Sequence, residues 1–231
     1  MEAIILAGGL GTRLRSRLNG VPKPMADIGG RPFLAVLLDR LATSGIRRVL
    51  LSVGYLNDVI IQYFGNTWRG MEISYVVEDI PLGTGGAIRK SLAKAHTESI
   101  LILNGDTWLQ AEYQQIMDFH KAQHAAITLA LTWVENRARY GGVTVSSGRV
   151  TGFLEKGSIG PGWINGGVYV LQRDFPWPDG LANTFSFETD VLFPHLTQLH
   201  HAIYETNGYF LDIGVPEDLD RAQVELNTPT S

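Results

Sequence analysis

The sequence contains no cysteine among its 231 residues, which excludes a disulfide framework, a thiolate nucleophile and a thiolate metal site. It has no excess of basic residues: 19 lysines and arginines against 23 aspartates and glutamates give a net charge of −4, which disfavours a nucleic-acid-binding surface. It also lacks an apolar run near the roughly 20 residues that cross a bilayer, and a basic, cleavable N-terminal segment. We therefore expect a soluble, cytoplasmic protein that binds neither nucleic acid nor membranes.

The chain has no internal repeat and no linker rich in Pro, Gly or Ser that would separate independent domains. We therefore expect a single domain over residues 1–231. In residues 1 to about 125, apolar runs alternate with helical patterns, which predicts a Rossmann-like, mostly parallel α/β sheet with crossover helices. Residues from about 126 to 215 predict a smaller, largely antiparallel lobe facing the first half, and residues 216–231 a closing helix and tail.

In the first half, the expected strands are Ala3–Leu6, Val49–Val53, Ile73–Val77 and Ile100–Leu103. The expected helices are Phe33–Ser44, Asp58–Phe64 after a cap at Asn57, Ala87–Ala95 and Glu112–His124. In the second half, the expected strands are Ile127–Val134, Gly142–Val145, Val150–Leu154 and Val168–Leu171, and the expected helices are Phe187–Phe193 and Glu217–Leu226.

The most informative motif follows the first strand, where the chain reads AGGLGTRL from Ala7. Glycines let a phosphate approach the main chain closely, and oriented N–H groups at the carboxyl edge of a sheet form an anion-binding concavity. Arg13 and then Lys23, which stands between two prolines, bring positive charge to this loop. The motif predicts a cradle for a triphosphate.

Three other interpretations of this loop compete. A dinucleotide-binding fingerprint needs a third glycine where Leu14 stands, and a P-loop needs a Gly-Lys-Ser/Thr run that the chain does not contain. An ordinary strand-to-helix turn with a surface arginine has little need of Gly-Gly-x-Gly and a lysine between prolines.

A second glycine loop, LGTGGA, begins at Leu82 and leads into a helical pattern. Its backbone could lie against a planar base, or the helix N-terminus could attract an anion. The alternative, a helix start built from small residues, is favoured when the motif is considered alone.

Two aspartates follow apolar stretches: Asp106 in Asn104-Gly105-Asp106 and Asp212 in FLDIG. A carboxylate at the end of a buried strand needs a partner, and Mg²⁺ held by one or two carboxylates and substrate phosphates is the natural one beside a triphosphate loop. An Asx turn is the alternative for Asp106, and the role of Asp212 is an even choice on its own.

The second half contains Glu155-Lys156 and, shortly after, Asn165-Gly166-Gly167. A carboxylate and an amide that bond hydroxyls, next to an ammonium for a phosphate, suit a phosphorylated polyol. By spacing alone, a surface ion pair is favoured. His120 and His124 have the spacing of zinc ligands on a helix, but Lys121 replaces the required glutamate, and we interpret both as solvated.

These residues together resemble the sugar-1-phosphate nucleotidylyltransferases. The motifs LAGGLGTRLR, PKPM, LGTGGA, NGD, EK, NGG and FLDIGVPED occur in that family's order over Ala3 to about Leu226. Within the family the chain is most similar to the D-glycero-α-D-manno-heptose 1-phosphate guanylyltransferases, through RPFLAVLLDRL, NGDTW, RYGGV, WINGGVYV and FSFETD. The chain lacks the family's proline soon after GTRL, which affects the exit geometry of the first loop but removes no catalytic group.

The resemblance implies the nucleotide-diphospho-sugar transferase fold, with a nucleotide-binding first half and a sugar-binding lobe. It implies nucleotide contacts at Leu6, Ala7, Gly8, Gly9, Gly11, Thr12, Arg13, Lys23, Gly83, Thr84 and Gly85. It implies sugar-phosphate contacts at Asn104, Gly141, Glu155, Lys156, Asn165 and Gly166, and a Mg²⁺ site at Asp106 and Asp212. Arg13, Lys23 and Asp106 would be the catalytic residues.

The implied reaction is transfer of a nucleoside monophosphate from an NTP, with GTP favoured, to a sugar 1-phosphate, with the heptose favoured, for surface polysaccharide or glycan synthesis. Other pairs stay open: mannose 1-phosphate with GTP, or glucose or N-acetylmuramate 1-phosphate with a pyrimidine NTP. A glycosyltransferase would want Asp-x-Asp where Asn104 stands, and a non-catalytic nucleotide sensor has little use for both aspartates. A homodimer is the expected assembly, with aromatics such as Trp163, Trp177 and Tyr209 as interface, sugar-covering or packing residues.

Overall fold

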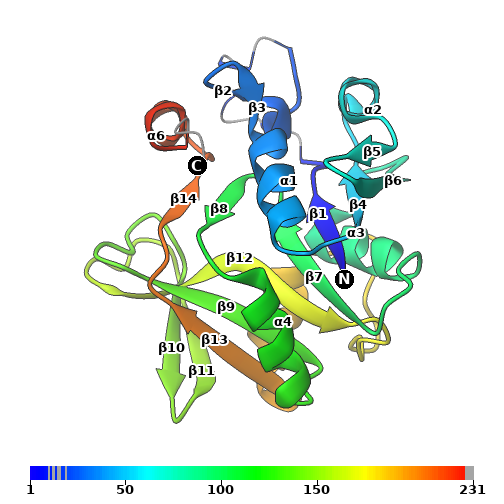
Figure 1. The fold of residues 1–231 in the computed structure, drawn as a ribbon. Helices are drawn as coiled ribbons and strands as arrows, with labels where there is room; N and C mark the ends of the chain where they lie inside the picture. Colours follow the sequence, from blue (N-terminus) through cyan, green and yellow to red (C-terminus); the bar gives the residue numbers. More distant parts are fainter. Residues whose placement is uncertain (10, 12–13, 15–16, 19, 227–231) are drawn as a thin grey trace.

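The computed structural model describes residues 1–9, 11, 14, 17–18 and 20–226 (Figure 1). Within these residues the main sheet has ten strands, with the path β11-β10-β12-β7-β1-β4-β6-β5 and with β9 pairing both β12 and β13. Its parallel part comprises β1 (Glu2–Leu6), β4 (Arg48–Val53), β6 (Met71–Val77) and β7 (Ser99–Asn104). These strands pair in the order β7-β1-β4-β6, and antiparallel β5 (Thr67–Trp68) completes that edge. The predicted mostly parallel α/β sheet is confirmed.

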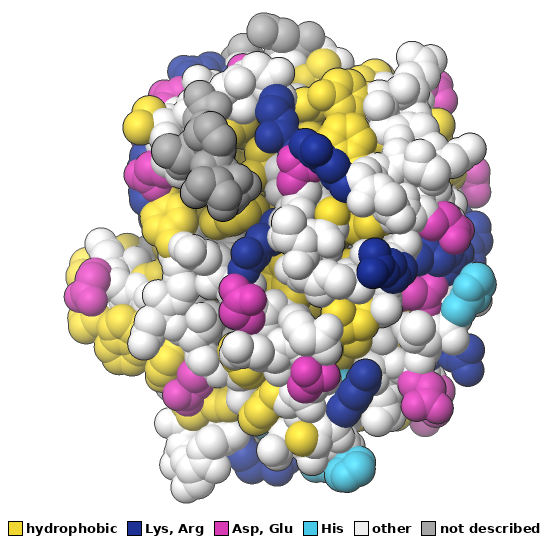
Figure 2. Space-filling view, viewed as in Figure 1, with side chains coloured by type: hydrophobic (Ala, Val, Ile, Leu, Met, Phe, Trp, Pro, Cys, Tyr) yellow, Lys and Arg dark blue, Asp and Glu magenta, His cyan; other side chains and the backbone are white. Residues whose placement is uncertain are grey.

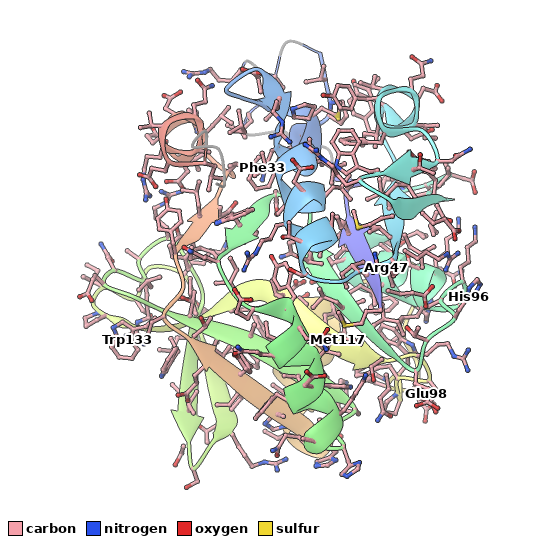
Figure 3. The ribbon with its side chains drawn as sticks, viewed as in Figure 1. Phe33, Arg47, His96, Glu98, Met117 and Trp133 are labelled. Atoms are coloured by element: carbon pink, nitrogen blue, oxygen red, sulfur yellow. The ribbon has the colours of Figure 1, made fainter. Side chains whose placement is uncertain are left out.

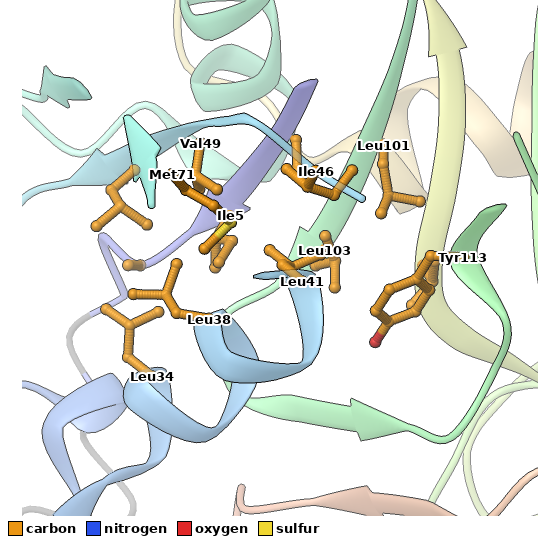
Figure 4. Packing of buried hydrophobic residues seen from close by; sticks show 14 of the residues in the cluster. Ile5, Leu34, Leu38, Leu41, Ile46, Val49, Met71, Leu101, Leu103 and Tyr113 are labelled. Carbon is orange, nitrogen blue, oxygen red and sulfur yellow. The ribbon is translucent and has the colours of Figure 1, made fainter. Parts of the chain in front are cut away.

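The helices cover both faces of this sheet. On the near face lie α1 (Phe33–Thr43), α2 (Asn57–Phe64) and α4 (Tyr113–Ala122), and Figure 3 marks α1 by Phe33 and α4 by Met117. Leu34, Leu38 and Leu41 of α1 pack on the strands here, as Figure 4 shows. On the other face lie α3 (Gly83–Leu92) and the π-helical turn η3 (Glu188–Leu192). Burial of apolar side chains on both faces explains the continuous apolar runs of the strands.

The second half extends the same sheet. Its strands are β9 (Ile127–Val134), β10 (Gly142–Ser146), β11 (Arg149–Leu154), β12 (Gly162–Gln172) and β13 (His201–Thr206). They pair antiparallel except for β13, which runs parallel to β9. The lobe is therefore largely antiparallel, as predicted, but β12 pairs with β7, so it continues the sheet of the first half instead of facing it.

Two short two-stranded sheets complete the fold, together with the remaining helical segments. They are β2 (Asp27–Ile28) with β3 (Arg31–Pro32), and β8 (Thr107–Leu109) with β14 (Phe210–Asp212). The remaining helical segments are η2 (Lys23–Met25), α5 (Phe193–His195), η4 (Leu196–Gln198) and α6 (Pro216–Glu225). A separate apolar cluster joins α1 to α6 through Phe33, Leu211 and Leu219. Helices long and apolar enough to cross a membrane are absent from the described residues.

The structure corrects several local predictions. Asn57 is the first residue of α2, and not its cap, while α3 begins at Gly83, four residues before the predicted start at Ala87. His120 is not solvated: it is buried against β9, where its Nδ1 lies 2.9 Å from Thr128 Oγ1, and burial lowers its pKa to about 4. His124, at the end of that helix, is exposed as expected.

The three aromatic side chains left open by the sequence are each partly buried. Trp177 packs against Phe185 and Phe187, and Trp163 contacts Trp133 at the outer end of β9, which Figure 3 labels. On the face shown in Figure 2, basic and acidic side chains are interspersed and do not form a field of one sign.

Candidate active site

The first glycine loop leaves the sheet from its middle. β1 lies between β4 and β7, and the Ala7 amide donates to the Ser52 carbonyl at 2.8 Å, one residue past the end of β1. Leu6 and Ala7 therefore stand at the carboxyl edge of the parallel strands, where open α/β sheets bind ligands. Of the other predicted residues in this loop, Gly8, Gly9 and Gly11 are described, whereas Thr12 and Arg13 lie outside the described residues.

The three described glycines have different surroundings. A Cβ on Gly8 would stand 2.6 Å from Glu78 Oε1, and a Cβ on Gly11, whose φ is +57°, would stand 2.9 Å from Lys23 Cβ. A Cβ on Gly9 would meet no atom of the described residues within 4 Å. Gly8 and Gly11 thus pack closely on other parts of the protein, whereas the described residues leave space at Gly9 on the side where a side chain would be.

Lys23 points from the first loop region to the aspartates. It begins η2, and its Nζ donates to Asp106 Oδ2 at 2.6 Å and lies 3.9 Å from Asp212 Oδ1. Its side chain is only 13% exposed, while those of Asp106 and Asp212 are 39% and 35% exposed. The structure therefore brings together three residues that are more than eighty positions apart in the sequence.

The aspartates meet because of the small β8–β14 sheet. Asp212 is the register partner of Thr107, and the Ile213 amide donates to the Asp106 carbonyl at 3.0 Å. On the other side, the Gly105 amide donates to the Leu6 carbonyl at 3.0 Å, and a Cβ on Gly105 would come within 2.5 Å of that oxygen. Only glycine at position 105 allows the aspartate turn to lie this close to the first loop.

Within the described part of the chain, the two carboxylates of this cluster face a single ammonium, that of Lys23, and the excess of negative charge fits a bound cation. Asp212 Oδ1 is buried without a hydrogen-bond partner among the described residues, and burial, followed by the nearby Asp106 carboxylate, raises the pKa of Asp212. Carboxylate oxygens that converge beside a phosphate site are the ligands that Mg²⁺ prefers, with waters and phosphates completing its octahedron. The described residues hold no group of three or more His, Asp or Glu that could complete a metal site alone. The residues therefore fit a cation shared with a substrate.

The second glycine loop packs on the protein itself. The Gly85 and Gly86 amides both donate to the Phe185 carbonyl, at 3.0 and 3.4 Å. A Cβ on Gly83 would lie 2.4 Å from that oxygen, and one on Gly85 would lie 2.2 Å from the Phe185 ring. Thr84 Oγ1 donates to Glu188 Oε2 at 2.8 Å. The small residues of this loop are accounted for by its contacts with residues 183–188, and a nucleotide role for Gly83, Thr84 and Gly85 stays a prediction.

The predicted sugar residues lie along neighbouring strands. A register irregularity of β12 between Asn165 and Tyr169 contains Gly166 and Gly167, and a Cβ on Gly167 would be 3.0 Å from Asn104 Nδ2. The NGG segment thus lies beside the end of β7, where Asn104 Oδ1 is buried without a partner. Bulges of this kind re-aim side chains next to active sites.

The remaining predicted sugar-site residues lie on neighbouring strands β11, β10 and β12. Gly142 pairs with both Leu154 and Ile164. Gly141, Glu155 and Asn165 are each one residue away from this row of paired residues, on the same side, so they lie next to one another. Glu155 and Lys156 are exposed just after β11. This arrangement places hydroxyl-binding groups and the Lys156 ammonium along the same edge of the sheet as Asp106.

Two acidic residues beside these loops were not singled out from the sequence. Glu78 accepts from Ser52 Oγ and from the Leu82 amide, both at 3.0 Å, and so joins the start of the second loop to the end of β4. Glu188 contacts both Thr84 and Tyr169. Glu188 lies within FSFETD, a motif in which the residue types alone indicate no chemical role.

Comparison with known proteins shows which family the chain resembles over nearly its whole length. Residues 2–228 match the family model described as nucleotidyl transferase. The chain is 43% identical to D-glycero-α-D-manno-heptose 1-phosphate guanylyltransferase of Aneurinibacillus thermoaerophilus over 98% of both chains, and 41% identical to the protein of that name in Campylobacter jejuni, over 94% and 96%. The crystal structure of HddC from Yersinia pseudotuberculosis complexed with GMP-PN is 34% identical, with a TM-score of 0.84 over 96% of this chain and 98% of that one.

These matches span nearly the whole chain and include the glycine loop, the lysine and both aspartates. The nucleotide-diphospho-sugar transferase fold predicted from the sequence is confirmed by the structural neighbours. The chain belongs to the nucleotidyl transferase family.

Proposed function

We propose that this enzyme transfers GMP from GTP to D-glycero-α-D-manno-heptose 1-phosphate and releases pyrophosphate. The observation that carries the proposal is the cluster of Lys23, Asp106 and Asp212 beside the open middle of the first glycine loop. The choice of GTP and heptose is supported by the names of the two bacterial relatives and by the HddC complex with GMP-PN.

The chemistry asks for positioning and charge. A sugar phosphate is mostly dianionic near neutral pH because its second pKa is about 6, so its oxygen is already a nucleophile and needs no general base. The phosphate oxygen attacks the α-phosphorus of the nucleotide, the bond to the pyrophosphate oxygen breaks, and the charge moves to pyrophosphate. Both reactants are anions, so the site must hold them in line and offset their repulsion.

The described residues divide these tasks. Lys23, fixed by Asp106 and largely covered, would present its ammonium to the α-phosphate. Gly8 and Gly9 would hold the base and ribose, and Gly11 the β- and γ-phosphates. Arg13, which lies outside the described residues, would bind the same phosphates. Asp106 and Asp212 would hold Mg²⁺, which when bound supplies positive charge to the phosphates.

The sugar side would be formed by Glu155, Asn165 and the backbone at Gly141, with Lys156 for the sugar phosphate. The support is their common side of the β11-β10-β12 row, next to Asn104 and Asp106. The product would be an activated glycosyl donor, so the reaction that consumes it is a glycosyl transfer. We place it in cytoplasmic synthesis of a surface polysaccharide or glycan such as a capsule, by a homodimer.

The substrate pair is tested by a matrix of four NTPs against the 1-phosphates of heptose, mannose and glucose, with pyrophosphate release as the measurement. GTP with the heptose phosphate should give the highest kcat/KM, and release should require both substrates. A preference for UTP or dTTP with glucose 1-phosphate would overturn the assigned pair and keep the reaction class. Release without sugar phosphate, or no release from any pair, would overturn the reaction.

The carboxylate site is tested by Asp106→Asn. A preorganised charged group of this kind commonly contributes about 2.7–4 kcal/mol to the barrier, so turnover should fall roughly a hundred- to a thousandfold. Circular dichroism should show the wild-type fold. Near-normal turnover in the folded variant contradicts a metal role for Asp106.

A further inference from the structure

Among the described residues, Glu188 is the one side chain that hydrogen-bonds both to the second glycine loop and to Tyr169, which lies behind Asn165. Its Oε2 accepts from Thr84 Oγ1 at 2.8 Å and from Ser186 Oγ at 3.2 Å, and its Oε1 accepts from the Tyr169 hydroxyl at 3.3 Å. It is the first residue of the π-helical turn η3. π-helical turns are rare and occur frequently at functional sites, where the extra residue changes the direction of a side chain.

On the sugar side, the network fixes which way the amide of Asn165 faces. Tyr169 is fully buried, and its hydroxyl carries a single proton. Because a carboxylate only accepts, the hydroxyl donates to Glu188 and must accept from Asn165, whose Nδ2 lies 2.5 Å away. The Asn165 Oδ1 then accepts from the Gly167 amide at 3.1 Å. One N–H and one oxygen lone pair of Asn165 remain, in a defined arrangement.

On the nucleotide side, the same carboxylate holds Thr84. The Thr84 hydroxyl accepts from the Phe187 amide at 2.8 Å and therefore has its proton available for Glu188. The Phe185 amide donates to the Leu82 carbonyl at 3.0 Å, so the loop is tied to residues 185–188 at three places. Loss of the carboxylate would leave the Thr84 hydroxyl without its acceptor at the beginning of α3.

We propose that Glu188 is a positioning residue that sets the amide orientation of Asn165 through Tyr169 and holds the second glycine loop through Thr84, so that one carboxylate aligns both substrate sites. This inference rests on the proposed function, because it takes Asn165 as a sugar contact and the loop at Thr84 as a nucleotide contact. It goes beyond that function in naming a residue that touches neither substrate and determines the affinity for both.

The chemical argument predicts what an amide would do in place of the carboxylate. Glu188 accepts hydrogen bonds from both directions, whereas glutamine offers one oxygen and one N–H group. Glu188→Gln therefore satisfies one side of the network and presents a donor to the other. An unpaired buried polar group costs enough to change a binding constant by about fivefold or more.

The experiment measures KM for each substrate with the pair that is most active in the pyrophosphate-release matrix. Tyr169→Phe should raise KM for the sugar 1-phosphate at least fivefold and change KM for the NTP less than twofold. Thr84→Val should do the reverse. Glu188→Gln should raise KM for at least one of the two substrates at least fivefold. In the double variant Glu188→Gln/Tyr169→Phe, KM for the sugar 1-phosphate should change by less than the two single-variant changes multiplied together.

The matched control is Tyr113→Phe, a buried tyrosine whose hydroxyl donates to the Leu109 carbonyl at 3.3 Å outside this network. It should leave both KM values within twofold even where its unfolding temperature falls, which separates positioning from general loss of stability. If Glu188→Gln does not fold, Tyr169→Phe and Thr84→Val carry the test.

Unchanged KM values in folded Tyr169→Phe and Thr84→Val, or equal changes of both KM values in each, would overturn the proposal. A failure of the proposed function is distinct, since wild-type enzyme would then release no pyrophosphate from any pair. In that case, calorimetric titration of the same variants with GTP and with the heptose phosphate tests the proposal. The proposal requires Tyr169→Phe to weaken only the binding of the sugar phosphate. Absence of binding by the wild type would overturn it.

Discussion

The two glycine loops look alike in the sequence but differ in what surrounds them. In the first loop, a Cβ on Gly9 would meet no atom of the described residues within 4 Å, so the space on that side of Gly9 is not filled by them. In the second, Gly83, Gly85 and Gly86 each face residues 183–185, with a Cβ approach of 2.7 Å or less. One loop is open at its centre for a ligand, whereas the glycines of the other are required by the packing of the protein. A glycine-rich motif therefore predicts a close approach without telling what approaches.

The largest expected effect concerns the Lys23 ammonium beside the first loop. Lys23→Met removes the ammonium that lies between Asp106 and Asp212, and turnover should fall roughly a hundred- to a thousandfold, the usual effect of losing one preorganised charged group. Pyrophosphate release under saturating substrates is the measurement.

The control for this change is Lys121→Met on the exposed side of α4, which should retain wild-type turnover. More than a tenth of the wild-type activity in folded Lys23→Met would contradict a catalytic role for the first loop and its lysine.

The next effect is on stability and belongs to the second loop. Gly83→Ala places a methyl 2.4 Å from the Phe185 carbonyl at a φ of +68°, so the free energy of unfolding should fall by about 2–4 kcal/mol, from left-handed strain and overpacking together. Urea denaturation measures it. Gly70→Ala is the matched control, with a φ of +81° and no described atom within 4 Å of its Cβ, and should lose only the strain contribution of about 1–2 kcal/mol. Equal losses in the two variants would show that Phe185 does not constrain the second loop.

Gly9→Ala should give the opposite pattern. The added methyl meets no protein atom, so the free energy of unfolding should stay within about 0.5 kcal/mol of wild type. The methyl would occupy space next to the main chain that the nucleotide needs, and KM for the NTP should rise roughly tenfold, the effect of about one methyl group in a close-fitting site. Wild-type KM in this variant would mean that the nucleotide does not approach the loop at Gly9.

The smallest expected effect is a gain in stability from Asp212→Asn. Burial and the Asp106 charge raise the pKa of Asp212, so its ionised form destabilises the fold above that pKa and the penalty disappears as the pH falls through it. The metal-free variant should therefore unfold at the same or a slightly higher temperature than wild type at pH 8, with the difference vanishing in acid.

Thermal unfolding with and without MgCl₂ completes this measurement. The cation should raise the unfolding temperature of wild type more than that of Asp212→Asn, because ligands that bind only the folded state stabilise it. Asp79→Asn, an exposed aspartate, should behave as wild type. An equal response to MgCl₂ in all three proteins contradicts a cation site at Asp212.

The local sequence pattern was sufficient to predict a strand where the strand's own residues determine its environment. β9 was predicted with its observed bounds, and β1 to within one residue, because continuous apolar runs are buried on both faces. α3 was predicted to begin at Ala87, but the helix begins at Gly83, where the Gly85 and Gly86 amides bond to the Phe185 carbonyl from a distant segment. His120 was predicted as solvated once the zinc-ligand pattern failed at Lys121, and β9 with Thr128 covers it instead.

The same division applies to the site. The order and chemistry of its motifs, with the family resemblance, predicted the first glycine loop, Lys23, Asp106 and Asp212 as site residues, and the structure brings Lys23 and the two aspartates together. The pairing of β8 with β14, three residues each, has no local signal, and it is this pairing that places Asp212 beside Asp106. Glu188 acquires its contacts only when residues 84, 169 and 188 meet in space. The sequence by itself determined the kind of chemistry, whereas the tertiary structure decided which groups share a charge or a proton, because those interactions depend on distances between segments far apart in the chain.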